Sequence, residues 1–232
     1  MKERTFDDFD DFAKEYRSIH TQNVKLSGVD SLYFAKHKVL QLKNTESDNA
    51  IRMLDIGCGD GATEVFIQEN FPSWQVEGID VSTQSIEEAQ SKKLYAARFQ
   101  LYGGVNIPFD DSSFEVVFIA AVLHHIDFSL HPIIIKEIYR VLKPGGRLYL
   151  FEHNPLNPVT KHLVKTCVFD KNARLLSYAY TKKIIQQQAF TSITKKFILF
   201  FPRKGILSKL VSLESHLWWL PLGGQYYFRA VK

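Results

Sequence analysis

The sequence predicts an α/β fold in which helices cover both faces of a mostly parallel β-sheet. Short apolar runs alternate with helical stretches between residues 51 and 152, and this alternation is typical of parallel strands joined by helical crossovers. A glycine-rich stretch, GCGDG, directly follows the first apolar run, as in loops that lead from a strand into a helix beside a ligand. The length of 232 residues suits one domain with a decorated core.

The first two thirds of the chain carry the clearest periodic signals. Phe6, Phe9, Phe12 and Tyr16 recur at helical spacing and predict a first helix. Apolar runs and the polar, proline and glycine breakers between them define the following elements. The expected strands are 51–56, 75–79, 98–101, 115–122 and 147–152, and the expected helices are 31–42, 62–71, 85–93 and 132–142.

The last third of the chain is less regular. Residues 154–176 are predicted to form an insertion that would act as a lid. A helix over 180–189, a strand over 192–201, a helix over 205–219 and a final strand over 225–231 are expected to follow, and a mixed sheet edge permits this last pair. We therefore divide one domain, 1–232, into a helical cap (1–48), a ligand-binding core (49–153), the insertion (154–176) and the remaining sheet (177–232).

Composition and charge restrict the class of protein. Residues 151–232 hold 13 Lys+Arg and 3 Asp+Glu, a balance of +10, whereas the first 150 residues balance at −6 within the total of +4. This basic third is either a solvated face or one that attracts an anionic substrate or membrane surface. No apolar run reaches the roughly 18 residues of a membrane helix, and the acidic N-terminus does not resemble a signal peptide. Cytoplasmic location is expected.

Cysteine and basic-residue patterns exclude further classes. Cys58 and Cys167 are too few and too distant for a disulfide framework or a zinc site, so both are expected to be reduced and no metal is expected. No dedicated nucleic-acid module is visible, and the sequence leaves the oligomeric state open.

The glycine loop is compatible with either of two classes of ligand. GCGDGA fits the dinucleotide pattern, and Asp80 lies 21 residues after Gly59, where a ribose-binding acid is expected. However, Asp55 and Asp60 would then face the phosphates of NAD(P), and like charges repel at close range. A ligand with an ammonium group and no phosphate, such as S-adenosylmethionine, would instead be attracted by Asp55.

Three stretches together resemble the class I S-adenosylmethionine-dependent methyltransferases: LDIGCGDG with Asp80, IPFDDSSFEVVFIAAVLHHI, and RVLKPGGRLYLFEHN. The resemblance covers roughly residues 50–153. It implies a Rossmann-like, seven-stranded sheet with an antiparallel last strand. It also implies methyl transfer from S-adenosylmethionine to a small-molecule acceptor, with S-adenosylhomocysteine as product. An oxidoreductase, or a protein of this fold that binds cofactor without catalysis, is the alternative.

The same resemblance assigns cofactor-binding roles. The methionine end would lie on the first loop, the ribose and adenine edge would lie on Asp80 and Val81, and Ala120 would supply a backbone contact to the methionine amine. Relatives often carry an acid where this chain has Gly103, so backbone groups of Gly103 and Gly104, or Tyr102, would contact the adenine. The first loop contributes Asp55, Gly57, Cys58, Gly59 and Gly61.

Candidate catalytic residues follow the fourth and fifth strands. Histidine titrates near neutrality and can act as a base, which favours His124 and His153, while His125 is expected to be structural. In relatives that methylate phosphoethanolamine, a histidine at the place of His124 pairs with an N-terminal tyrosine, and Tyr16 is the matching candidate. The stretches EHNP, CVFD and PLGGQY resemble a bacterial subgroup, and the lysines of the insertion favour an anionic acceptor.

Overall fold

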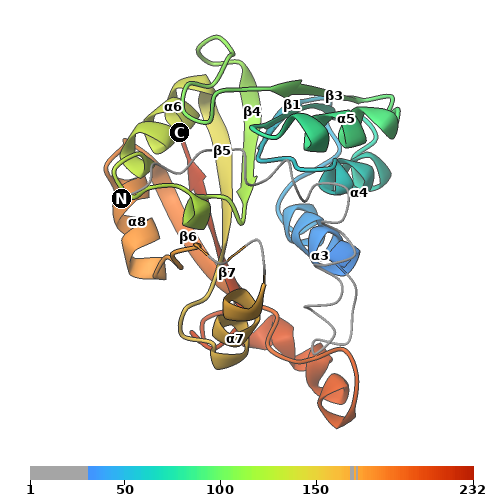
Figure 1. The fold of residues 1–232 in the computed structure, drawn as a ribbon, viewed down its shortest axis with the longest axis vertical. Coiled ribbons are helices and arrows are strands. Elements are labelled where there is room, and N and C mark those ends of the chain that lie inside the picture. Colours follow the sequence, from blue (N-terminus) through green and yellow to red (C-terminus); the bar gives the residue numbers. More distant parts are fainter. Residues whose placement is uncertain (1–30, 168–169, 171) are drawn as a thin grey trace.

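A computed structural model describes residues 31–167, 170 and 172–232. The predicted first helix and Tyr16 lie outside these residues. Within them the chain begins with helix α3 (Ser31–Lys43), which confirms the second predicted helix, and the rest forms layers around one central sheet (Figure 1).

The sheet has seven strands in the order β3-β2-β1-β4-β5-β7-β6. Strand β7 runs antiparallel to both of its neighbours, β5 and β6, and the other pairings are parallel. This confirms the predicted α/β class and the antiparallel last strand. The strands are β1 (Arg52–Ile56), β2 (Gln75–Asp80), β3 (Ala97–Leu101), β4 (Phe114–Ala120), β5 (Leu142–His153), β6 (Thr191–Ile198) and β7 (Gln225–Val231).

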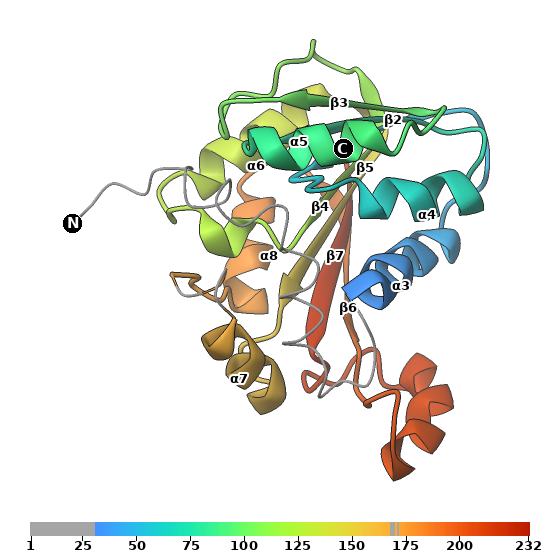
Figure 2. The same cartoon turned by 45° about the vertical axis from the view of Figure 1, so that its right-hand side comes forward.

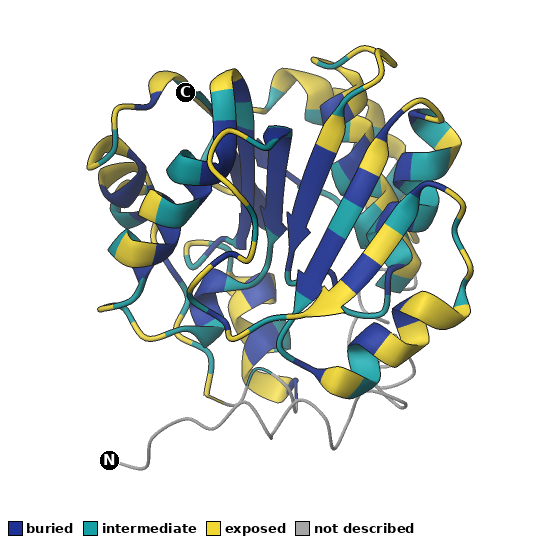
Figure 3. Cartoon of the chain, turned by 90° about the horizontal axis from the view of Figure 1, so that it is seen from above, coloured by how far each residue is buried: buried dark blue, intermediate teal, exposed yellow. Residues whose placement is uncertain are grey.

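Helices cover both faces of the sheet, and strand alternation explains how. Successive residues of β4 point to opposite faces, so Val117 packs in the cluster that contains the buried residues of α6 and α8, while Val116 and Phe118 pack in the cluster beneath α3 and α4. The central strands are buried on both sides (Figure 3). The helices are α4 (Ala62–Asn70), α5 (Thr83–Ser91), α6 (His131–Val141), α7 (Pro158–Thr166) and α8 (Tyr178–Gln186).

Three elements differ from the sequence-based expectation. The predicted insertion contains a helix, α7, which begins at Pro158 with the side chain of Asn157 accepting a hydrogen bond from the Thr160 amide. Strand β5 starts already at Leu142 and includes the PGG stretch predicted to separate helix from strand. Residues 206–216 form a 3₁₀-helix, η3 (Ile206–His216), instead of an α-helix. None of the helices in the described ranges is long and apolar enough to cross a membrane.

Candidate functional site

The predicted site residues lie where parallel strands end. Strands β2, β1, β4 and β5 are neighbours in the sheet, so the loops after their carboxyl ends meet at one edge, the usual location of ligands in such sheets. These loops supply the glycine loop after β1, Asp80 at the end of β2, a short 3₁₀-helix η2 (Leu123–His125) after β4, and His153 at the end of β5.

The backbone of β2 and the Asp80 carboxylate hold the glycine loop. The Gly57 amide donates to the Ile79 carbonyl at 2.7 Å, and the Gly59 amide donates to Asp80 Oδ2 at 2.9 Å. The other oxygen, Asp80 Oδ1, accepts from the Ser82 amide at 2.9 Å. Asp80 therefore links the loop to the start of α5, and its carboxylate lies beside the loop.

Two acids lie buried behind this loop. Asp55 is 2% exposed and Glu64, in the first turn of α4, is fully buried. Burial raises the pKa of both acids, and it brings that of Glu64 to about 7. The negative charge of Glu64 raises the pKa of Asp55 further. Lys38 of α3 lies near Asp55 and Glu152; burial lowers its pKa to about 8 although both carboxylates oppose this shift.

Asp55 and Asp60, the two acids on which the argument against a phosphate ligand rests, have different surroundings. Asp60 pairs with Lys92, the residue directly after α5, with 3.6 Å between Lys92 Nζ and Asp60 Oδ2, so its charge is balanced within the protein. Asp55 faces a second carboxyl group instead. The electrostatic argument for a cationic ligand therefore depends on Asp55 and Glu64, not on Asp60.

We expect Glu64→Gln to stabilise the protein above neutral pH. The pKa of Glu64 is about 7 in the fold against 4.5 for a free side chain, so stability falls as pH rises from about 4.5 through 7 because a buried carboxyl group must ionise. The glutamine cannot ionise, and its amide can donate to Asp55. Urea unfolding at pH 8 should show a gain of about 3 kcal/mol, with no gain at pH 4.

Glu69→Gln, an exposed change on the same helix, is the control and should alter stability by less than about 0.5 kcal/mol at either pH. An equal effect of the two substitutions would contradict the assignment of a buried acid pair.

The other predicted cofactor positions surround the loop. Cys58 is buried as a free thiol, and burial raises its pKa well above the usual value, so it stays neutral. Val81 directly follows β2 and Ala120 ends β4. Of the two glycines after β3, Gly103 is exposed, whereas Gly104 is buried with φ +84°. A Cβ on Gly103 would meet no protein atom within 4 Å, so packing alone does not require a glycine there.

A histidine cluster occupies the ends of β4 and β5. His124 is 1% exposed, and its Nδ1 lies 2.6 Å from Glu152 Oε2. The other oxygen of Glu152 accepts from the Leu123 amide at 2.9 Å, which fixes the carboxylate below η2. The ring of His153 lies 5.1 Å from that of His124, so the structure brings together the two histidines that the sequence singled out.

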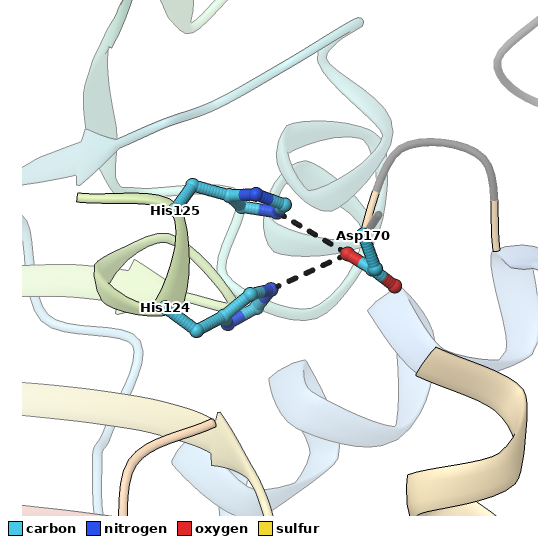
Figure 4. Close-up of side chains that lie close together, drawn as sticks. All are labelled: His124, His125 and Asp170. Carbon is cyan, nitrogen blue, oxygen red and sulfur yellow. Dashed lines mark ion pairs between the residues drawn. The ribbon is translucent and has the colours of Figure 1, made fainter. Parts of the chain in front are cut away.

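Asp170 approaches both histidines of η2 from the predicted insertion (Figure 4). Its Oδ1 lies 3.6 Å from His124 Nε2 and 3.4 Å from His125 Nε2. Burial lowers the pKa of His124, but the charge of Glu152 and hydrogen bonds with Asp170 and Glu152 outweigh this effect and raise it to about 9. Burial and the charge of His124 lower the pKa of His125 to about 3. At neutral pH His124 is therefore protonated and donates hydrogen bonds, whereas His125 is neutral.

The three ligand atoms of His124, His125 and Asp170 lie within 4.8 Å of one another, and among the described residues they form a group that could hold a metal ion. Two ligands of one zinc ion lie about 3.3 Å apart, so a metal would require the cluster to contract. A metal on Nε2 would also have to displace the proton that faces Asp170. The protonated ring of His124 directs one N–H toward Glu152 and the other toward Asp170, which is sufficient to link the two carboxylates.

Sequence reasoning missed the partners that set the charge of the site. Glu64, Glu152, Asp170 and Lys38 were not singled out, although three of them had usable signals. Glu64 follows the glycine loop, Glu152 stands in the EHN stretch, and Asp170 ends the CVFD stretch. Lys38 gave no signal, because its approach to the sheet depends on how α3 packs.

Comparison with known proteins agrees with the resemblance. Residues 54–150 match the model of a family described as "Methyltransferase domain". A demethylmenaquinone methyltransferase of Staphylococcus carnosus is 32% identical over 155 residues, which are 64% of this chain. The aligned region is 63% of that relative's length, so this chain spans less than two thirds of it.

Solved structures share the fold over nearly the whole chain. A structure from Thermotoga maritima described as a SAM-dependent methyltransferase superposes with a TM-score of 0.70 at 20% identity, and the match covers 98% of this chain and all of that chain. The [4+2]-cyclase SpnF superposes with a TM-score of 0.63 at 19% identity and covers 85% of this chain and 81% of that chain. The fold is therefore shared by proteins described by different reactions.

Proposed function

Because residues 54–150 carry the methyltransferase domain in sequence and the chain carries the fold of S-adenosylmethionine-dependent methyltransferases, we propose that this protein transfers a methyl group from S-adenosylmethionine to a small-molecule acceptor. The aligned relative named as a methyltransferase supports this proposal. Neither the family match nor the relative supports the oxidoreductase alternative.

The observation that carries the proposal is the pair of buried acids behind the glycine loop. A dinucleotide would place its phosphates on this loop, close to the buried carboxyl groups of Asp55 and Glu64. The negative charge of the phosphates would make either carboxyl group harder to ionise. The ammonium group of S-adenosylmethionine reverses the sign of this interaction. Asp80 would accept hydrogen bonds from the ribose hydroxyls of S-adenosylmethionine, and the adenine edge would lie between Val81 and the Gly103–Gly104 turn.

The roles of the loop residues follow from the same arrangement. Gly57, Gly59 and Gly61 would let the backbone approach the methionine portion, with Cys58 as a neutral lining group, and Ala120 would present its backbone to the amine. In this proposal residues 1–48 form a cap and 154–176 a lid over one domain. The whole chain would act in the cytoplasm.

The acceptor would bind between η2 and the end of β5. His124 would hold Glu152 and Asp170 in place beside the acceptor, because the pKa near 9 leaves it protonated at neutral pH and its two ring nitrogens face these carboxylates. His153 is then our candidate for the base, and Tyr16 would close the site from the N-terminal segment. Exposed Lys161 and Lys165 on α7 favour an anionic acceptor.

Calorimetric titration tests the cofactor. We expect S-adenosylhomocysteine to bind the wild-type protein and NAD⁺ to give no heat. Asp80→Ala should weaken S-adenosylhomocysteine about tenfold, because it removes a charged hydrogen-bond acceptor and the anchor of the Gly59 amide.

The matched control is Asp110→Ala, which removes an exposed aspartate from the turn before β4 and should leave the affinity unchanged. Binding of NAD⁺ in place of S-adenosylhomocysteine would refute the proposal. Intact cofactor binding without turnover across a wide panel of acceptors would instead support a non-catalytic protein of the same fold.

A further inference from the structure

Large apolar side chains are exposed at one end of the molecule. Eight of the thirteen exposed large hydrophobic residues in the described part of the chain lie between residues 156 and 222, including the two exposed tryptophans. We call these eight residues the apolar rim: Leu156, Val159, Ile206, Leu207, Leu213, Trp218, Trp219 and Leu222.

The rim belongs to segments that the structure holds together. The side chain of Asn157, at the start of α7, donates to the Leu222 carbonyl at 2.7 Å, and the Phe197 amide of β6 donates to the Trp218 carbonyl at 2.8 Å. Helices α7 and η3 project at the same end of the molecule in both views (Figures 1 and 2). The rim is therefore assembled by tertiary contacts.

The helix η3 gains little from packing on its own protein. None of its eleven residues is buried, and Ile206 at its start is 81% exposed. A polar anchor holds it instead: Glu214 accepts hydrogen bonds from the Phe200 and Phe201 amides at 2.9 Å and pairs with Arg203 at 2.8 Å. Its apolar side chains thus remain available for an external surface.

The stretch of sequence that carries the rim is rich in basic residues. Residues 154–224 contain eleven Lys+Arg and two acids, Asp170 and Glu214, and both acids take part in ion pairs with cationic or imidazole groups. Lysines Lys161 and Lys165 on α7 and Lys204 and Lys209 beside or within η3 are exposed. Apolar and aromatic residues flanked by lysines are the composition of segments that lie in a membrane interface.

We propose that the apolar rim is a docking surface for an anionic lipid bilayer. The tryptophans and aliphatic side chains would enter the interfacial region, while the lysines remain at the level of the headgroups, where each adds attraction to anionic lipid. A second copy of this chain is a poorer partner, because it would bring the same lysines against one another. Binding of the rim to a bilayer does not depend on the proposed methyl transfer.

Docking would place the carboxyl edge of the sheet next to the lipid. Asn154 follows His153 directly, and its side chain donates to the carbonyls of Pro221 and Gly223 beside Leu222. A bilayer touching the rim would therefore be close to the end of β5. If the protein is the methyltransferase proposed above, this position favours an amphiphilic acceptor with an anionic headgroup.

Vesicle sedimentation of the full chain tests the proposal. We expect the protein to sediment with vesicles of phosphatidylcholine and phosphatidylglycerol and to remain in solution with phosphatidylcholine alone. Trp218→Ser with Trp219→Ser should weaken the partition constant at least about tenfold through lost apolar burial. Lys204→Glu with Lys209→Glu should weaken it by a similar factor, about tenfold or more, through lost attraction to the anionic lipid.

Tyr95→Ser is the matched control, because Tyr95 is 70% exposed but precedes β3 at the opposite edge of the sheet; it should sediment as the wild type does. Circular dichroism and S-adenosylhomocysteine titration of each variant verify the fold and test the proposed function separately. Failure of the wild type to sediment with anionic vesicles would overturn the proposal, as would tryptophan variants that bind them normally. Self-association that requires the tryptophans, without vesicle binding, would assign the rim to a dimer instead.

Discussion

Gly57→Ala is expected to lower the free energy of unfolding by about 2–4 kcal/mol and to weaken S-adenosylhomocysteine binding at least tenfold. Gly57 has φ +75°, and a Cβ on it would lie 2.3 Å from Val122 Cγ2. The alanine adds the strain of a left-handed backbone, about 1–2 kcal/mol, to a clash with the turn that carries the histidines. Relief of the clash would move the loop away from Asp80. Urea unfolding and calorimetric titration measure the two effects.

Two further variants separate strain from the clash. Gly59→Ala also places alanine at a positive φ, +54°, but its Cβ meets nothing within 4 Å, so it should cost only about 1–2 kcal/mol. Combining Gly57→Ala with Val122→Ala removes the methyl group that clashes and should cost less than the sum of the single changes. Strict additivity of the two, or equal losses in both glycine variants, would contradict this explanation.

Glu152→Gln is expected to lower the free energy of unfolding by about 3–5 kcal/mol at pH 7. Glu152 is 1% exposed and pairs with a buried histidine at 2.6 Å. Without its charge, burial lowers the pKa of His124, so a charged imidazole is no longer sustained in the interior. Urea unfolding measures the stability, and NMR titration of the His124 ring measures its pKa, which should fall from about 9 to below neutrality.

The wild type should also show a dependence of stability on pH that the variant lacks. The pKa of His124 is raised from 6.5 to about 9 in the fold, so this contribution is fully present below pH 6.5 and is lost as pH rises through 9. The expected loss is about 3 kcal/mol. Glu88→Gln is the control, since Glu88 is an exposed member of a pair with Lys92 and should change stability by less than about 1 kcal/mol. An unchanged His124 titration in Glu152→Gln would contradict the assigned pair.

Much of the fold could be predicted because its signals are local. Apolar runs such as 115–122 and the breakers around them indicated all seven strands, and the glycine loop with Asp80 indicated which edge of the sheet holds the ligand. Local signals were weakest where packing is sparse. The helix predicted over 205–219 is a 3₁₀-helix with no buried residue. Because none of its residues is buried, its hydrophobic periodicity was a weak guide to the type of helix.

The charge states of the site could not be predicted in the same way. From the sequence, Asp55 and Asp60 could not be distinguished. In the structure Asp60 pairs with Lys92, 32 residues later, whereas Asp55 lies against Glu64. The sequence predicted that His124 is a base, yet Glu152 and Asp170 keep it protonated. Each outcome depends on a partner that is distant in the chain or on burial.

The sequence alone determined the α/β class and the glycine loop that matches a family model described as a methyltransferase domain, and its resemblance to class I S-adenosylmethionine-dependent methyltransferases implied the antiparallel last strand. The strand and helix signals repeat within short windows. Only the tertiary structure decided that Glu64 is buried beside Asp55, that Asp170 reaches His124 and His125, and that the exposed Trp218 and Trp219 are held against β6 through the Phe197 amide. The reason is physical: pKa values and exposure are set by desolvation and by neighbours in space, and the folded chain brings those neighbours together from segments that the sequence separates.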